Sequence, residues 1–172
     1  MDRQTRKLLK FDLRDGTFIE EKNSIIFAQS FSLLNDTTYI FYTNGDGSEI
    51  PGGSLDWDNK IIITDRENLN ISRKYFPGEC RLIGQYPFIE SSNSFKVRLP
   101  YNDTIYEVTQ DTIRPSVFVD FDRFGLPDGY YYMSFDQQRE FDLNKMACLM
   151  NVYESDQYFL FKWGYENRLR SH

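Results

Sequence analysis

The sequence has only one histidine, His172, which is also its last residue. Because chain ends are usually mobile, we expect no imidazole to be held rigidly beside a nucleophile. Catalytic triads of the Ser-His-Asp and Cys-His types need such an imidazole, so the sequence argues against both. The two cysteines, Cys80 and Cys148, are far apart in the sequence. They do not form a zinc-binding pattern, and we expect buried free thiols rather than a disulfide framework.

Other familiar sequence signals are also missing. No GxGxxG or GxxxxGK[ST] nucleotide-binding pattern occurs, and no apolar run approaches the roughly 18 residues that a membrane-spanning helix requires. The opening residues, MDRQTRKLLKFDL, are partly basic, but the long apolar region of a secretory signal does not follow them. We therefore expect a cytoplasmic protein that does not enter a membrane and uses neither a cofactor nor a metal.

The chain carries more acidic than basic side chains, 26 against 20, for a net charge of −6. The acidic residues are concentrated between residues 101 and 156, whereas basic residues gather near the two ends. An acidic surface repels phosphate groups, which argues against nucleic acid as a partner. It attracts basic protein surfaces and accelerates the encounter with them. The charge pattern therefore favours a protein partner with a basic surface.

Short strands separated by turns are predicted almost throughout the chain. Asp15-Gly16 lies between two apolar segments and predicts a β-hairpin, because both residues tolerate a positive φ. In residues 94–99, SFKVRL, three apolar side chains alternate with two basic ones, as in a half-buried strand. The regular spacing of such segments predicts a mainly β fold with a single domain over residues 1–172. We expect an antiparallel meander that forms a barrel or a sandwich.

Few segments interrupt this pattern. Residues 45–59 hold four glycines and one proline and predict a long exposed loop. Residues 66–76 fit neither the strand nor the helix period cleanly and could form a short helix. Residues 136–146 predict another short helix, with Asp136 as its N-cap. The fold is therefore expected to contain one or two short helices.

Residues 116–135, SVFVDFDRFGLPDGYYYMSF, resemble two strands joined by a Pro-Asp-Gly turn. Asp120 and Asp122 would then leave the same face of the first strand, because side chains alternate along a strand. Together with Glu107 or Asp111 they could hold a magnesium ion, which prefers oxygen ligands. The alternative is that they form the solvent face of a half-buried strand.

Aromatic residues are unusually frequent at 17% of the chain. Three consecutive tyrosines in the second predicted strand cannot all face inward, so Tyr130 and Tyr132 share one face and Tyr131 the other. Residues 157–163, QYFLFKW, are likewise apolar or aromatic on both faces. Such strands either lie in the middle of the fold, covered on both sides, or form a docking surface.

The first functional hypothesis is a non-enzymatic protein-binding module. Tyr130 and Tyr132 would be its aromatic anchors, and Asp120, Asp122 and Asp128 its acidic rim. Immunity proteins against bacterial toxins and phage proteins that block host factors have this general character, since they are small, acidic and without catalytic motifs. We expect an inhibitor of this kind, which docks on another protein and neutralises it.

Three alternatives remain open at this stage. A β-barrel could enclose a small ligand, with Trp57 and Trp163 beside the tyrosines in its lining. A divalent-metal hydrolase acting on phosphate esters would use Asp120 and Asp122. The chain could also be a structural subunit of a larger assembly.

Overall fold

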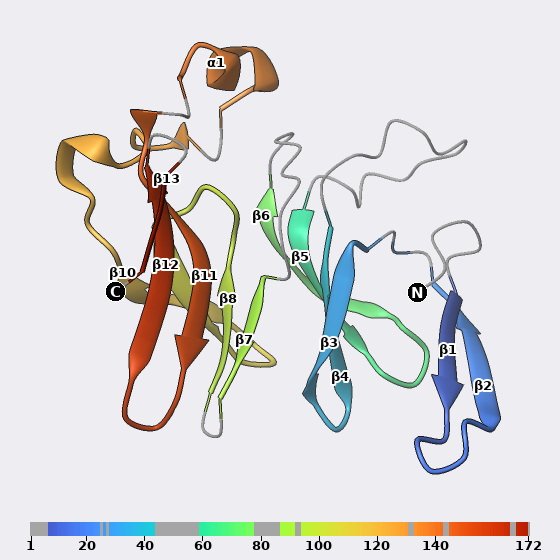
Figure 1. The fold of residues 1–172 in the computed structure, drawn as a ribbon. Helices are drawn as coiled ribbons and strands as arrows, with labels where there is room; N and C mark the ends of the chain where they lie inside the picture. Colours follow the sequence, from blue (N-terminus) through green and yellow to red (C-terminus); the bar gives the residue numbers. More distant parts are fainter. Residues whose placement is uncertain are drawn as a thin grey trace.

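The computed structural model of the chain describes residues 7–24, 26, 28–43, 59–77, 87–91, 94–130, 133–142, 145–165 and 168–171. Its strands form four antiparallel sheets, which follow one another along the chain and lie in a row in space (Figure 1). Within each sheet, every strand is hydrogen-bonded to the strand that follows it in the sequence. Each sheet is therefore a simple meander.

The four sheets differ in their number of strands. The first is a hairpin of β1 (Lys7–Phe11) and β2 (Phe18–Asn23). The second contains β3 (Ser30–Asn35), β4 (Thr38–Tyr42), β5 (Asn59–Asp65) and β6 (Ile71–Pro77). The third contains β7 (Phe88–Glu90), β8 (Phe95–Arg98), β9 (Thr104–Val108) and β10 (Ile113–Phe118). The fourth contains β11 (Cys148–Glu154), β12 (Phe159–Tyr165) and β13 (Arg168–Ser171).

Strand β5 shows how the sheets are stacked. Ile61 and Ile63 belong to an apolar cluster that also contains Val97 of the third sheet. Ile62, which lies between them, belongs to a different cluster with Leu8 of the hairpin. All three isoleucines of β5 are at most 1% exposed. Because neighbouring side chains of a strand point to opposite faces, this apolar run is buried by one sheet on each side.

A third apolar cluster joins the last two sheets. It contains Ile89 and Ile105 of the third sheet and Leu149 of the fourth, with Phe159 and Phe161 packed against it. Strand β7 also contacts β11, so the first strands of these two sheets lie beside each other. Each pair of neighbouring sheets in the row therefore shares a hydrophobic core, which is the main source of stability of such an arrangement.

The predicted fold class is confirmed in its main features, since the structure is mainly β and its sheets are antiparallel. The sheets pack face to face as in a sandwich, and the described strands form no closed barrel. The Asp15-Gly16 turn forms as predicted, with a φ of 74° at Gly16. The prediction of a possible short helix at residues 66–76 is wrong, because β6 occupies most of that segment. The loop predicted at residues 45–59 lies outside the described residues, apart from Asn59.

The hairpin predicted over residues 116–135 is also wrong. Strand β10 ends at Phe118, and the chain continues as an irregular segment with a 3₁₀ turn, η2 (Asp122–Phe124), and a helix, α1 (Phe135–Arg139). This helix is shorter than the one predicted, and its N-cap is Ser134 rather than Asp136. Ser134 and Gln137 form a capping box, which starts a helix where the sequence pattern had indicated a strand.

Candidate interaction surface

The aspartates predicted as an acidic rim lie in the segment that follows β10. Asp120 Oδ1 accepts the backbone N–H of Asp122 at 2.7 Å, which helps to hold Asp122 at its positive φ of 51°. The side chains of Asp120, Asp122 and Asp128 are all exposed. Because β10 ends at Phe118, Asp120 and Asp122 do not share one strand face, and the geometry predicted for a magnesium site is absent from this segment.

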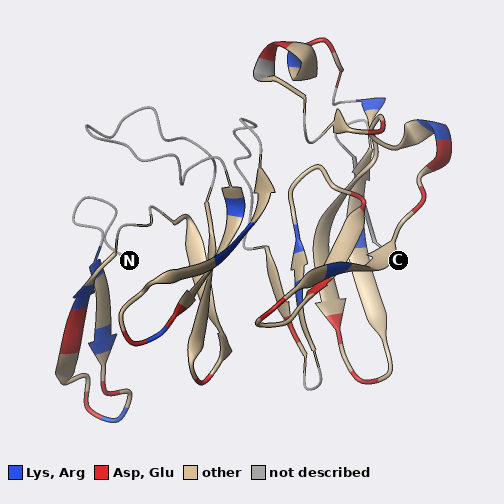
Figure 2. Ribbon diagram, turned by 180° about the vertical axis from the view of Figure 1, so that it is seen from behind, with Lys and Arg blue, Asp and Glu red and all other residues tan. Residues whose placement is uncertain are grey.

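Two exposed aromatic rings lie among these aspartates. Phe118 is 67% exposed and Phe124 is 37% exposed. The guanidinium of Arg123 lies 4.9 Å from the centre of the Phe124 ring. We call the exposed aspartates and phenylalanines between the end of β10 and Asp128 the acidic loop surface, which comprises Phe118, Asp120, Asp122, Phe124 and Asp128; the basic residue Arg123 is also exposed in this segment. Figures 1 and 2 show the segment at the end of the row that carries the fourth sheet, away from the β1–β2 hairpin.

The structure corrects the role predicted for Tyr130. Its side chain is only 5% exposed, and its ring packs 5.8 Å from that of Phe141 and 6.5 Å from that of Tyr101. The backbone carbonyl of Tyr130 accepts a hydrogen bond of 2.9 Å from Gln138 Nε2. Tyr130 therefore belongs to the local core and is not an exposed anchor. Tyr132 lies outside the described residues.

A further carboxylate, Asp103, lies beneath the acidic loop surface and was missed by the sequence analysis. Its Oδ1 atom is buried without a hydrogen-bond partner. Burial raises the pKa of Asp103 to about 6, the backbone N–H of Leu126 lowers it, and the negative charge of Asp120 raises it. A methyl group added at Gly125 would lie 3.2 Å from Asp103 Oδ2, so the loop packs closely on this carboxyl group. In the sequence, Asn102-Asp103 suggests only a turn.

Buried polar groups also occupy the interface between the third and fourth sheets. Arg98, predicted on the solvent side of its strand, is only 5% exposed, and its Nη1 donates to the carbonyl oxygen of Leu149 at 2.7 Å. Burial lowers the pKa of Arg98, while Cys148 and Tyr42 raise it. Burial raises the pKa of the free Cys148 thiol, and the charge of Arg98 lowers it. Cys80 lies outside the described residues.

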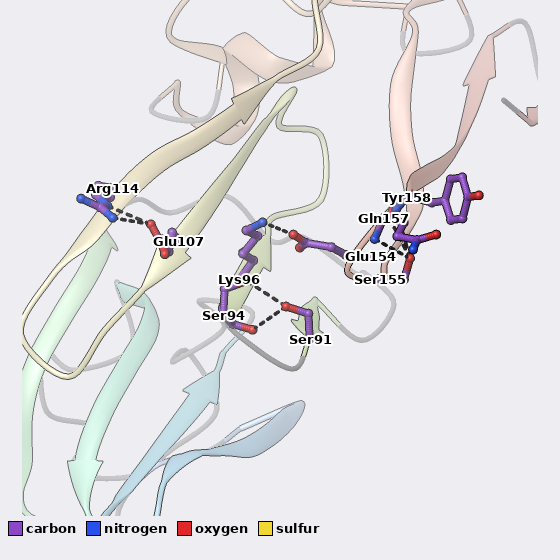
Figure 3. A network of polar contacts seen from close by, with 9 residues as sticks. All are labelled: Ser91, Ser94, Lys96, Glu107, Arg114, Glu154, Ser155, Gln157 and Tyr158. Atoms are coloured by element: carbon purple, nitrogen blue, oxygen red, sulfur yellow. Dashed lines mark hydrogen bonds and ion pairs between the residues drawn. The ribbon is translucent and has the colours of Figure 1, made fainter.

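A network of polar contacts reinforces the same interface at its other end (Figure 3). Lys96 of β8 forms an ion pair with Glu154 of β11. Within the third sheet, the hydroxyl groups of Ser91 and Ser94, between β7 and β8, are hydrogen-bonded at 2.9 Å. The ion pair joins the two sheets and the serine contact joins two strands of one sheet, so we interpret both as structural.

Two open clefts lie between the sheets. One has a volume of about 470 Å³ and is lined by residues that include Lys10, Lys22 and Arg66. The other has a volume of about 530 Å³ and is lined by residues that include Glu90 and Glu107. Within the described parts of the chain, no group of three or more His, Cys, Asp or Glu residues is placed to hold a metal ion. None of the helices described is long and apolar enough to cross a membrane.

Comparisons with known proteins identify a family and a solved structure to which this chain is similar. Residues 1–170 match the model of the DUF5128 family, which is described as a 6-bladed β-propeller. A similar solved structure is the crystal structure of a "putative exported protein" from Bacteroides fragilis NCTC 9343, with a TM-score of 0.70 and 16% identity. The match covers 98% of this chain and 49% of that one, so the chain spans about half the length of its structural relative. No curated protein matches the chain.

These findings explain the row of sheets and correct one expectation. In a propeller, each four-stranded antiparallel meander is a blade that packs face to face against its neighbours. The second and third sheets are complete blades in this sense, and the fourth has three described strands. The cytoplasmic location expected from the sequence is contradicted, because the relative from Bacteroides fragilis is described as exported.

Proposed function

We propose that the chain, which belongs to the DUF5128 family of 6-bladed β-propellers, is a non-enzymatic protein-binding module that docks on and neutralises a partner with a basic surface. Fold alone does not decide function, so the proposal depends on the site. The observation that carries it is the exposure of two phenylalanine rings, Phe118 and Phe124, among three exposed aspartates. Aromatic anchors surrounded by charge are typical of protein interfaces.

The two kinds of residue would make different contributions to binding. Burying an exposed phenylalanine side chain contributes about 1.5–3 kcal/mol to the free energy of binding. Phe118, which is 67% exposed, would contribute more than Phe124 because it has more surface to bury. The aspartates would act mainly on the association rate, because charges of opposite sign on the partner steer the encounter. Phe118 and Phe124 thus replace Tyr130 as the proposed anchors, and Asp120, Asp122 and Asp128 keep their proposed role.

Backbone hydrogen bonds hold the segment that carries this surface, one within the segment and two to neighbouring parts of the chain. The N–H of Gly125 donates to the carbonyl of Asp122 at 3.0 Å, and the N–H of Ala147 donates to the carbonyl of Phe124 at 2.6 Å. The N–H of Val119 donates to the carbonyl of Asp103 at 3.0 Å. A surface that is already ordered loses less conformational entropy when it binds, which favours affinity.

Site-specific photo-crosslinking tests the proposal directly. Phe118 is replaced by a photoreactive phenylalanine derivative, and the protein is expressed and irradiated in its native cells. We expect one dominant crosslinked protein with an excess of Lys and Arg on its surface. The same derivative at the exposed residue Arg73 of β6 is the control and should not capture it.

The acidic residues are tested by combining the crosslinker at residue 118 with Asp120→Asn, Asp122→Asn and Asp128→Asn. The yield of the crosslinked complex should fall, because the charges that steer the partner are removed. Equal capture from residues 118 and 73, or an undiminished yield in the triple variant, would contradict the proposed binding surface.

A further inference from the structure

The cleft of about 530 Å³ between the second and third sheets shares no residue with the acidic loop surface. Its volume lies within the range of pockets that hold small molecules. It is bordered by the end of β3, by the connection between β7 and β8, and by the connection between β9 and β10. Three segments that are distant in the sequence therefore meet around one cleft.

Three residues of the third sheet form a row along one side of this cleft. Glu90 of β7 is the register partner of Phe95 of β8, and Phe95 is the partner of Val108 of β9. Register partners of neighbouring strands lie on the same face of a sheet. Val108 belongs to the core shared with the second sheet, and Phe95 and Leu34 pack against that core. Two apolar side chains thus face the second sheet, with the carboxylate of Glu90 beside them.

A contact across the cleft confirms the direction of the Glu90 side chain. The hydroxyl group of Ser32, on β3, donates a hydrogen bond to Glu90 Oε1. Glu90 is nevertheless exposed to solvent. A carboxylate has about four lone-pair positions, so Glu90 can accept further hydrogen bonds in addition to the one from Ser32. Its negative charge is therefore accessible to a ligand that lies along the apolar row.

The other carboxylate at this cleft, Glu107, points to the opposite face of the third sheet. Glu107 precedes Val108 in β9, and successive side chains of a strand lie on opposite faces. Its carboxylate accepts two hydrogen bonds from Arg114, of 2.9 and 2.7 Å (Figure 3). Among the described residues that line the cleft there is no lysine or arginine. Of these residues, Glu90 is thus the one whose charge faces the cleft.

The cleft between the hairpin and the second sheet has a different electrostatic character. Its lining includes Lys10, Lys22 and Arg66. Lys10 forms an ion pair with Glu20 at 3.0 Å. Lys22 Nζ donates to the backbone carbonyls of Arg66 and Glu67 at 2.8 and 3.0 Å. These lysines are engaged with groups of the chain itself, so this cleft has less to offer a charged ligand.

We propose that the cleft between the second and third sheets binds an alkylammonium group, that is, a positively charged amine on a short apolar chain. The ammonium group forms a charge-assisted hydrogen bond with Glu90, and the apolar chain lies along Phe95 and Val108. A neutral ligand would instead cover the Glu90 charge without compensating it, which is costly. The strands that carry Glu90 and Val108 are two strand spacings apart, or roughly 10 Å, which suits a chain of about six carbon atoms.

The first test is a titration of the whole chain with hexylamine at pH 7 and low ionic strength, followed by the nuclear magnetic resonance shifts of backbone amides. We expect saturable shifts at residues 90, 95 and 108. Hexanol has the same apolar chain without the charge and should bind about tenfold more weakly, because it lacks the charge-assisted hydrogen bond. Added salt should weaken the binding of hexylamine, because an exposed charge is screened.

Two substitutions with the same chemistry distinguish the two faces of the third sheet. Glu90→Gln removes the charge that faces the cleft and should weaken the binding of hexylamine about tenfold. Glu107→Gln removes a charge on the opposite face and should leave this binding unchanged. Glu90 is exposed and Glu107 is half-buried, so both variants should fold, which circular dichroism checks.

A third compound distinguishes the two sources of an alkylammonium group, a free aliphatic amine and the lysine side chain of a peptide. Nα-acetyl-lysine methylamide carries the ammonium group on a chain that is attached to a peptide backbone. Tighter binding of this compound than of hexylamine assigns the ligand to a peptide, and weaker binding assigns it to a free amine. Either result supports the proposed class of ligand.

Three results would overturn the proposal. The first is the absence of saturable shifts at residues 90, 95 and 108. The second is equal affinity for hexylamine and hexanol, which would show that the charge of Glu90 does not select the ligand. The third is an equal effect of Glu90→Gln and Glu107→Gln. The triple variant of Asp120, Asp122 and Asp128 should bind hexylamine as the original protein does, so this proposal and the proposed function fail separately.

Discussion

Lys96 of β8 and Glu154 of β11 form an ion pair that joins the third and fourth sheets. Their side chains are only 11% and 18% exposed. The pair Lys10–Glu20 in the hairpin has the same chemistry, but its side chains are 47% and 40% exposed. Loss of one partner leaves a buried, uncompensated charge only in the first case, so the two pairs should differ strongly in their effect on stability.

Replacement of Lys96 by Met should therefore lower the free energy of unfolding by about 3–5 kcal/mol. Lys10→Met should change it by no more than about 1 kcal/mol. The double variant Lys96→Met with Glu154→Leu should recover most of the loss, because no charge then remains unpaired. Urea denaturation measures all three values, and equal effects of the two single replacements would contradict the structural role of the buried pair.

The pKa of Asp103 predicts a dependence of stability on pH. The carboxyl group has an ordinary pKa of 3.8 in the unfolded chain and, through burial, a pKa of about 6 in the folded protein. Between these values the folded state holds more protons than the unfolded state, so stability should fall as pH rises from about 4 to about 6. Above this range the contribution of Asp103 should be constant.

Asp103→Asn should remove this part of the pH dependence. At pH 7 the variant should be more stable than the original protein by about 1 kcal/mol, a value reduced for the partial exposure of the group. Asp120→Asn should lower the pKa of Asp103, because it removes a nearby negative charge. Nuclear magnetic resonance titration of the Asp103 carboxyl group measures the pKa, and an unchanged value in Asp120→Asn would contradict the proximity of the two groups.

The Cys148 thiol should be unreactive in the folded protein. Burial raises its pKa, so little thiolate is present near neutral pH. In a Cys80→Ser background, reaction with a disulfide reagent at pH 7 should be much slower in the native state than in urea. Arg98→Met should slow the native reaction further, since the charge of Arg98 lowers the pKa of Cys148. Equal rates in the native and unfolded states would show that this thiol is accessible and ionised.

Local patterns predicted the individual strands well, because a strand needs only a few neighbouring residues to be recognised. In residues 157–163, Phe159 and Phe161 pack against the core shared with the third sheet, as alternation requires, and the Trp163 ring lies 5.8 Å from that of Phe121 in the same cluster. Leu160 lies on the other face and is 53% exposed. Strand β8 was also found, but the burial of Lys96 and Arg98 was not. That burial depends on the neighbouring sheet, which supplies Glu154 and the carbonyl of Leu149.

The grouping of the strands into blades was not predicted, and the reason is physical. Each blade begins and ends at a long connection between two meanders. The alternation of side chains along a single strand does not show which connections these are. The uninterrupted run Ile61-Ile62-Ile63 was a usable signal, since a strand that is apolar on both faces lies between two layers.

The error at residues 129–135 had a different cause. Aromatic residues favour strands, so the three tyrosines led to the prediction of a strand. The Ser-x-x-Gln pattern of Ser134 and Gln137, which is typical of the start of a helix, was not taken into account. The exposed Phe118 and Phe124 were overlooked as anchors because the same incorrect hairpin had assigned their segment to regular alternation. The error in the candidate site thus follows directly from the error in secondary structure.

The three aspartates of the acidic loop surface should affect binding but not folding. Because Asp120, Asp122 and Asp128 are exposed, and because an Asn side chain keeps the oxygen that accepts the backbone N–H of Asp122, their replacement by Asn should change the free energy of unfolding by no more than about 0.5 kcal/mol. Urea denaturation of the triple variant provides this control. A large loss of stability would show that these residues have a structural role instead.

The central claim, binding through an acidic surface, is tested most directly by the association rate with the protein captured from residue 118, measured at increasing salt concentration. Charge steering predicts that the rate for the original protein falls steeply as salt rises. The rate for the triple aspartate variant should be lower at low salt and nearly independent of salt. Equal rates for the two proteins, unaffected by salt, would contradict the claim.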